Sequence, residues 1–260
     1  FAVGGLLAIA GGMMQVLLRN PLADPYVLGL SGGAACGALA ALLLGAAAFV
    51  TPAAFAGAAL STFVVFGLAR SDGAWSSTRL LLTGIVVAAG WGALIMLLLA
   101  LAPDAQVRGM LFWLIGDLSG ATHGTQALWV LAAVLLAALP LARDATLLAR
   151  GDVTAATLGV PVRNVGLALH ALAAAATAVA VTVAGSVGFV GLVVPHAVRL
   201  VVGNDQRVLL PASALAGGTL LVLADTLART IVAPAQLPVG VLTALAGVPM
   251  FLWLLRRSPA

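Results

Sequence analysis

The sequence predicts an all-α membrane protein that crosses the bilayer many times, and three observations indicate this class. Apolar residues make up 63% of the chain and charged residues only 8%, whereas a soluble domain has about 25% charged residues. The apolar residues form runs of roughly 20, which is the length of a helix that crosses hydrocarbon. The twelve cations are all arginine, and they lie mainly between those runs. We therefore expect one polytopic domain that covers residues 1–260.

Reading from one charged residue to the next gives about nine candidate spans, one of them short. Residues 26–69 are long enough for two helices, and Pro52 divides this stretch. Pro195 and His196 weaken the short candidate, and Asp225 weakens the one that follows it. The other candidates are 1–18, 80–103, 124–142, 164–186, 190–203, 208–228 and 231–255.

The arginines predict which ends of the helices face the cytoplasm. When the spans alternate in direction, ten of the twelve arginines fall on one side, and the positive-inside rule makes that side cytoplasmic. The same alternation places the C-terminus inside. Arg108 and Arg229 fall on or near the other side. The ten arginines of the crowded side are Arg19, Arg70, Arg79, Arg143, Arg150, Arg163, Arg199, Arg207, Arg256 and Arg257.

The longest polar stretch on the predicted cytoplasmic side is 143–163, RDATLLARGDVTAATLGVPVR. It is too polar to cross the bilayer, and Gly and Pro interrupt its helix-compatible runs. One interpretation is an ordinary connecting loop. The interpretation that we favour is a short helix pair that docks a soluble partner.

Two parts of the chain share a faint pattern at a spacing of 174 residues. Under the predicted topology they run in opposite directions through the membrane, as the inverted repeats of transporters do. Ala and Gly are so frequent in this chain that chance also explains the match. The matching residues are Ala10, Gly11, Pro21 and Gly29 in the first part and Ala184, Gly185, Pro195 and Gly203 in the second.

Several classes of function lack the residues that they require. A phosphate-binding loop of the GxxxxGK type needs lysine, which is absent, so the chain is not itself a P-loop ATPase. The scattered arginines form no basic face for nucleic acid. His123, His170 and His196 form no metal-binding spacing, and we interpret them as packing residues. Cys36 is the single cysteine, so there is no disulfide framework.

Asp225 and Arg229 are four residues apart and so lie on one face of a helix. An ion within or near the membrane is costly, which makes such a residue a candidate for function. One interpretation is a self-neutralising pair near a helix end. The other is that Arg229, close to the external surface, binds an acidic partner.

Five strings of the sequence, which occur in the same order in a known family, resemble the permeases of bacterial importers for ferric siderophores, haem and vitamin B12. The resemblance covers essentially the whole chain. It implies ten spans, and because Phe1 already lies in an apolar run, we expect one further span to precede it. The strings are RNPLADPYVLGLSGGA at 19–34, STRLLLTGI at 77–85, FWLIGDLSG at 112–120, GDVTAATLGVP at 151–161, and the segment 188–255 from GFVGLVVPHAVRL to FLWLL.

The resemblance implies an importer of the type II ABC class in the bacterial inner membrane. Two permease copies would form a homodimer with a central pathway, two ATPase subunits would use ATP and Mg on the cytoplasmic face, and a periplasmic binding protein would deliver the substrate. The permease itself would be no enzyme and would carry no cofactor and no metal. Arg229 matches a family arginine that meets the binding protein. The residues that match the family's ATPase-coupling segment are Gly151, Asp152, Ala155, Leu158 and Gly159.

Two further sets of residues match the cytoplasmic gates of the family. Ser77 and Thr78 correspond to one gate, and Asn20, Pro21 and Leu22 correspond to a second. The arginine-based topology places all five on the cytoplasmic side.

The implied function is alternating access for an iron complex, either haem or a ferric siderophore, with haem slightly favoured. Vitamin B12 is the main alternative, because importers of all three substrates share these motifs. An ion-coupled secondary transporter is a more remote alternative, since it would usually carry buried ionisable residues within the membrane. A membrane-embedded enzyme would need a polar catalytic cluster, which the sequence lacks.

Overall fold

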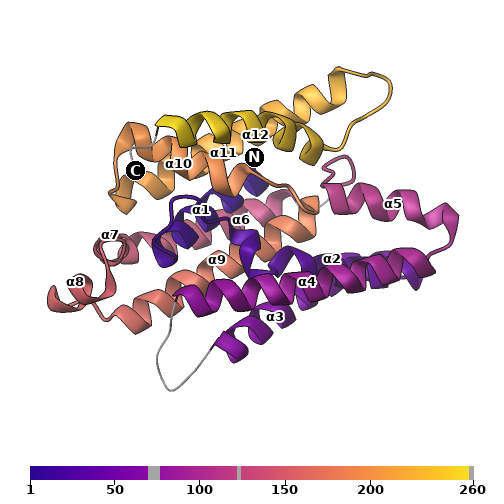
Figure 1. The fold of residues 1–260 in the computed structure, drawn as a ribbon. Helices are drawn as coiled ribbons and strands as arrows, with labels where there is room; N and C mark the ends of the chain where they lie inside the picture. The colour runs from indigo at the N-terminus through magenta and orange to yellow at the C-terminus, as the bar shows by residue number, and fades with distance from the viewer. Residues whose placement is uncertain (70–76, 122–123, 258–260) are drawn as a thin grey trace.

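The computed structural model describes residues 1–69, 77–121 and 124–257, and every regular element within them is helical (Figure 1). The longer helices run roughly parallel to one another in a single bundle. In chain order the elements are α1 (Ala2–Leu17), η1 (Pro25–Leu28), α2 (Leu30–Leu43), η2 (Ala47–Phe49), α3 (Val50–Ala69), α4 (Ser77–Leu101), α5 (Asp104–Ile115), α6 (Gly124–Ala138), η3 (Leu139–Leu141), α7 (Ala142–Leu148), α8 (Asp152–Thr157), α9 (Val162–Ala184), α10 (Val190–Val202), α11 (Gln206–Thr230) and α12 (Val239–Arg257).

Five stretches of the described chain are long and apolar enough to cross a membrane, and four shorter apolar helices accompany them. The all-helical membrane class predicted from composition is therefore confirmed, whereas the number of crossings stays a prediction. The five stretches are Ala47–Ala69, Arg79–Leu101, Gly124–Leu148, Val162–Ala184 and Gln206–Thr230.

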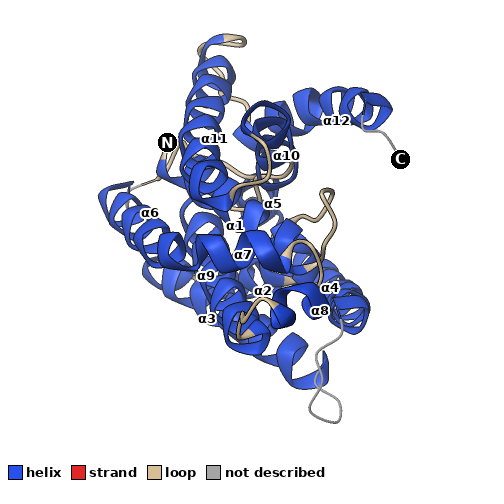
Figure 2. Cartoon of the chain, turned by 90° about the vertical axis from the view of Figure 1, so that its left-hand side faces the viewer, coloured by secondary structure: helices blue, strands red, loops and turns tan. Residues whose placement is uncertain are grey.

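Helix α1 forms the centre of the bundle, where it packs against α9, α10 and α11 (Figures 1 and 2). All but the last of its residues are buried. Glycine permits this close packing, because a Cβ atom at Gly11 would lie 1.7 Å from the carbonyl oxygen of Gly191. A Cβ at Gly4 would likewise lie 2.1 Å from the carbonyl oxygen of Gly217. Small residues at such crossings let helix backbones approach each other closely within lipid.

Helices α2 and α10 both begin deep inside the bundle at a residue in the left-handed conformation. These residues are Gly29, with φ 69°, and Phe189, with φ 67°. The two starts are joined, because the Tyr26 hydroxyl contacts both the carbonyl oxygen and the amide nitrogen of Val187 at 3.1 Å. The Ser61 hydroxyl, halfway along α3, donates to the Gly29 carbonyl at 2.8 Å. These polar contacts satisfy backbone groups that would otherwise be buried without a partner.

The 174-residue spacing does not relate equivalent elements. Pro21 precedes η1 in a loop, whereas Pro195 lies inside helix α10. Gly11 lies within α1, whereas Gly185 follows the end of α9. A repeat in another register is not tested by these positions.

Three boundaries differ from those predicted. The break within 26–69 lies at Leu44–Ala46, where Gly45 has φ 68°, and Pro52 falls in the first turn of α3, where a proline lacks no helical hydrogen bond. Residues 231–238 form a turn, so α12 begins at Val239. Helix α5 was not predicted, although Pro103 and Gly116 bound it as start and stop signals.

Two short helices, α7 and α8, do form within 143–163 at one end of the bundle, with α5 at the opposite end (Figure 1). Only α8 lies outside the apolar stretches, because α7 is the last part of the stretch Gly124–Leu148. The loop at 19–22 lies at the α8 end, as an ion pair described below requires. The side of the membrane that each end faces stays a prediction. Arg70, one of the arginines used to predict the orientation, lies outside the described residues. His123, one of the three histidines of the sequence, also lies outside them.

Candidate coupling and gate site

Helix α8 is a short helix of six residues that projects from the bundle. The backbone conformation at each of its two ends requires glycine. Gly151 precedes it with φ 118°, and Gly159 follows it with φ 82°, conformations that residues with a Cβ rarely adopt. Nothing lies within 4 Å of a Cβ at either position, so backbone conformation, not space, favours glycine. The Val160 amide donates to the Ala155 carbonyl at 3.0 Å and closes the C-terminal end.

The side chains of α8 divide into one buried anchor and an exposed apolar surface. Ala155 is fully buried and holds the helix on the bundle. Val153 is 79% exposed and Leu158 is 56% exposed. Because this end lies outside the apolar spans, both would face water unless another protein covered them. An exposed apolar pair on a projecting helix is typical of a docking surface.

Asp152 connects α8 to the predicted gate loop. It lies in the first turn of α8, where a carboxylate is favoured by the helix dipole, and it is 3.3 Å from the Arg19 guanidinium. The loop that follows Arg19 turns sharply, because the Asn20 carboxamide oxygen accepts a hydrogen bond from the Leu22 amide at 2.9 Å. Pro21 is exposed at the tip of this turn. Through Arg19, the structure therefore places the predicted gate at 20–22 next to the predicted coupling helix.

The other predicted gate, at Ser77 and Thr78, lies at the same end of the molecule. Ser77 and Thr78 begin helix α4, and their side chains lie outside the described residues. Leu80, one turn further, lines a cavity of about 110 Å³ together with Leu17 and Asp152. Residues of α1, α3, α4, α7, α8 and α9 line this cavity.

The Arg19–Asp152 pair yields a prediction about stability and function together. Its side chains are 40% and 51% exposed, and such a surface ion pair contributes no more than about 1 kcal/mol to folding. We expect Asp152→Asn to leave the melting temperature nearly unchanged while lowering ATP-dependent transport several-fold. Thermal unfolding and uptake assays on Asp152→Asn, Arg19→Gln and the double variant measure both effects. If the double variant transports no less than either single variant, the loss of transport comes from breaking the ion pair. Transport losses that add in the double variant would contradict a role for the pair.

Arg229 lies at the end of α11 opposite the coupling segment and is already paired. Its Nε donates to Asp225 Oδ2 at 2.8 Å, and its Nη2 donates to the Leu118 carbonyl at 3.2 Å. The predicted pair therefore forms, and its side chains remain 40% and 26% exposed. The contact with Leu118 holds the guanidinium over the segment that follows α5. A role in binding a partner stays a prediction.

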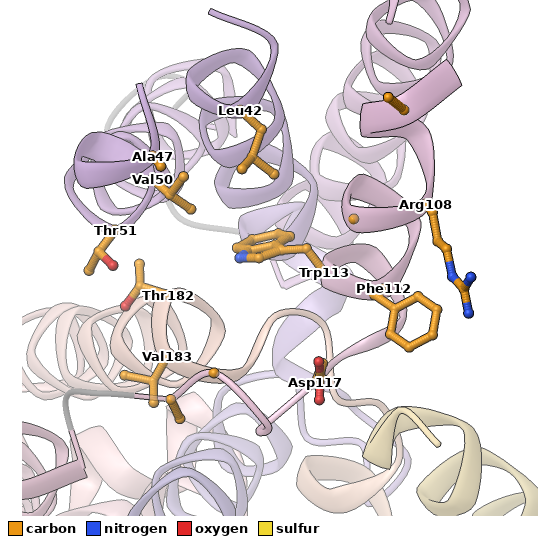
Figure 3. Close-up of a pocket in the computed structure, with 14 residues that line it drawn as sticks. Leu42, Ala47, Val50, Thr51, Arg108, Phe112, Trp113, Asp117, Thr182 and Val183 are labelled. Atoms are coloured by element: carbon orange, nitrogen blue, oxygen red, sulfur yellow. The ribbon is translucent and has the colours of Figure 1, made fainter. Parts of the chain in front are cut away.

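Sequence reasoning missed the cavity of about 710 Å³ that α5 helps to form (Figure 3). It lies between the ends of α2 and α9, the start of α3, and α5. Trp113 extends toward Leu42, whereas Arg108 points away from Thr182, with its guanidinium carbon 5.7 Å from the centre of the Phe112 ring. The signal available was the string FWLIGDLSG, whose helical part was not recognised because it is bordered by polar residues.

The sequence of this chain is similar to known proteins over nearly its whole length. Residues 1–257 match the model of the FecCD transport family. The chain is 47% identical to the cobalamin import permease BtuC of Halobacterium salinarum, over 98% of this chain and 69% of that protein. It is 45% identical to the hemin transport permease HmuU of Yersinia pestis, over 98% of this chain and 79% of that protein.

Solved structures agree with these relatives. A structure described as an inward-facing conformation of a metal-chelate type ABC transporter matches with a TM-score of 0.91 and 28% identity, covering 99% of this chain and 83% of that one. The PsaBC complex of Streptococcus pneumoniae matches with a TM-score of 0.66 and 19% identity, covering 97% and 87%, which shows a shared fold alone. The chain belongs to the FecCD transport family.

Proposed function

We propose that this chain is the permease subunit of an ATP-driven importer, embedded in the cell membrane with its C-terminus in the cytoplasm. The observation that carries the proposal is the projecting helix α8, which exposes Val153 and Leu158 and is tied to the gate loop through Asp152 and Arg19. A partner that grips α8 can thereby move the end of α1. The names of the relatives, one a cobalamin import permease and the other a hemin transport permease, support the same conclusion.

The proposed assembly contains two permease copies, two ATPase subunits and an external binding protein. ATP and Mg belong to the ATPase subunits, because this chain has no lysine with which to build a P-loop. The permease carries out no chemical reaction. It supplies the pathway and transmits movement from the ATPase to the gates.

The proposed mechanism is alternating access driven by movement of α7 and α8. ATP-driven closure of the ATPases displaces α8, and the Arg19–Asp152 contact at 3.3 Å transmits that displacement to the turn at Asn20. The 110 Å³ cavity beside Leu80 leaves room for α8 to shift relative to the start of α4. Both gates are therefore within reach of one moving element.

The proposed substrate is a metal chelate, either haem or cobalamin, with a ferric siderophore as a further candidate. The 47% and 45% identities to relatives named for cobalamin and hemin do not choose between the two. Purified transporter in vesicles, supplied with ATP and the matching binding protein, should take up one of the three chelates. Copurification with an ATPase subunit and uptake that stops without ATP are the expected results. Uptake that continues without ATP but follows an ion gradient would instead indicate a secondary transporter.

Reversing the charge of Arg229 tests the external docking role. We expect Arg229→Glu to weaken association with the binding protein at least tenfold, because two carboxylates would then repel each other and the acidic partner. The remaining association should also respond more weakly to added salt, since an attractive charge pair is lost. Binding kinetics at several salt concentrations measure this. Arg108→Glu is the matched control at the same end. Equal association by the wild-type chain and Arg229→Glu would leave Arg229 only its contacts with Asp225 and the Leu118 carbonyl.

A further inference from the structure

Over most of its length, helix α4 has a single polar side chain with which to bond to the bundle. From Gly84 to Leu101, Trp91 is the one residue whose side chain carries an N–H or O–H group. Its indole Nε1 donates a hydrogen bond to the Ser61 hydroxyl of α3 at 2.9 Å. Within hydrocarbon, a hydrogen bond between helices contributes to their association, because apolar side chains pack against lipid as well as against protein.

The Ser61 hydroxyl passes this attachment on to the start of α2. It donates to the Gly29 carbonyl at 2.8 Å while it accepts from Trp91. The same carbonyl accepts from the Gly33 amide at 3.1 Å, so it belongs to the first turn of α2. Ser61 is 0% exposed, so the contacts would not change if a further span preceded Phe1. We call this set of contacts the Trp91–Ser61–Gly29 chain.

The backbones of α2 and α4 also approach each other closely beside this chain. A Cβ atom at Gly32 would lie 2.7 Å from the Trp91 Cβ atom. One turn earlier on α4, the Ala88 amide nitrogen would lie 3.3 Å from a Cβ at Gly29, whose φ is 69°. Glycine at both positions therefore permits the crossing. Helix α4 is fixed to the start of α2 over one helical turn, by packing and by a hydrogen bond.

The backbone between Gly29 and the loop at 20–22 is held by its own hydrogen bonds. The Gly29 amide donates to the Tyr26 carbonyl at 2.9 Å, and the Tyr26 amide donates to the Asp24 carboxylate at 2.8 Å. The Ala23 amide donates to the Asn20 carbonyl at 3.0 Å. These bonds make the segment from Asn20 to Gly29 a compact unit, which can move as one body.

Helix α4 connects the other end of the chain to its own start. It is a continuous helix from Ser77 to Leu101, so Trp91 and Ser77 belong to one rigid element. The loop at 20–22 and the start of α4 are thus both attached to the Trp91–Ser61–Gly29 chain. The Arg19–Asp152 ion pair reaches only the first of these two segments.

We propose that Trp91 and Ser61 are positioning residues that make the loop at 20–22 and the start of α4 move together. This inference rests on the proposed function, in which the two segments are the gates of the permease. Helix α8 displaces the loop through Arg19, and the Trp91–Ser61–Gly29 chain carries that displacement to α4. One contact with α8 is then sufficient to operate both gates.

The test measures the distance between the two segments in the full transporter complex. Spin labels are attached at Pro21→Cys and Arg79→Cys, both exposed, in one permease copy per complex, and pulsed electron paramagnetic resonance is recorded with and without ATP. The native Cys36 is buried and should not react. We expect one narrow distance distribution in the otherwise wild-type chain. In Trp91→Phe, which keeps a ring but lacks the N–H, the population outside that peak should rise about fivefold, because one net hydrogen bond is lost.

Ser61→Ala should broaden the distribution in the same way, and the double variant should be no broader than either single variant. Thr62→Ala is the matched control on α3, because the Thr62 hydroxyl donates only to the Ala58 carbonyl of its own helix. Trp129→Phe is the matched control for the indole, since Trp129 is 74% exposed on α6. Neither control should change the distribution.

Uptake per ATP hydrolysed separates positioning from simple stabilisation. We expect this ratio to fall several-fold in Trp91→Phe and Ser61→Ala while ATPase binding persists. Narrow distributions and an unchanged ratio in both variants would overturn the inference, even if the melting temperature fell. A wild-type complex whose distances and uptake ignore ATP would instead overturn the proposed function. The broadening in Trp91→Phe without ATP would still support the link between the two segments.

Discussion

Replacing Gly11 with valine will prevent the chain from forming its native helix bundle. A Cβ atom at this position would lie 1.7 Å from the Gly191 carbonyl oxygen and 2.5 Å from its carbonyl carbon. Both atoms belong to the backbone of α10, so no side-chain rotation relieves the overlap. The two helices would have to separate, and α1 is the element around which α9 and α11 also pack. We expect a loss of at least about 3 kcal/mol, the upper range for an overpacked core.

Monodispersity in mild detergent and the melting temperature measure this effect. Gly67→Val is the matched control, because it adds the same side chain to a helix at a position with nothing within 4 Å. Valine and glycine differ by only a few tenths of a kcal/mol in helix propensity, so the control should behave as wild type. Equal stability of the two variants would mean that α1 and α10 do not cross at Gly11.

Composition and the spacing of charged residues predicted the long apolar helices. A helix in hydrocarbon must be apolar over nearly its whole length, which leaves a signal that needs no knowledge of its neighbours. Pro52 was read correctly as a sign that 26–69 holds two helices, although the turn forms at Gly45. Helix α5 escaped because polar residues border it and its length is only 12 residues.

The candidate site was less accessible to sequence reasoning, because its members come from distant parts of the chain. Arg19 and Asp152 are 133 residues apart, and neither lies in a pattern that points to the other. The resemblance to the family assigned roles to Asp152 and to Asn20, the neighbour of Arg19, but it did not predict the contact between Arg19 and Asp152. The cavity that both Leu80 and Asp152 line depends on six helices and on the packing of their side chains. Such sites arise from tertiary packing and require the structure.

The arrangement at the α8 end explains how a small motion could act on both gates. Helix α8 is anchored by one buried residue, Ala155, and is bounded by glycines at both ends. A short helix held in this way can tilt as a unit without unfolding. In the proposed mechanism, Asp152 would transmit this tilt to Arg19, whose backbone, with φ 49°, adopts a left-handed conformation at the end of α1.

Replacing Leu158 with aspartate should abolish ATPase docking while leaving the permease folded. Leu158 is 56% exposed and Val153 is 79% exposed, so neither contributes much to the folded bundle. Apolar side chains at the centre of an interface contribute about 2 kcal/mol or more each, which corresponds to at least roughly 30-fold weaker binding. We expect Leu158→Asp to lose ATP-dependent uptake and Val153→Asp to lose most of it.

Pull-down of the ATPase subunit, ATP-dependent uptake and thermal unfolding separate docking from folding. Val232→Asp makes the same change at an exposed valine of the turn that follows α11, at the end away from α8, and should leave ATPase binding intact. Normal docking by Leu158→Asp would exclude α8 as the coupling element. If Leu158→Asp loses docking while Asp152→Asn docks normally, the apolar side chains bind the ATPase and the Asp152 carboxylate transmits its movement. This division is expected because the Asp152 side chain is already paired with Arg19. The two functions, binding the ATPase and moving the gate, would then belong to different side chains of the short segment from Asp152 to Leu158.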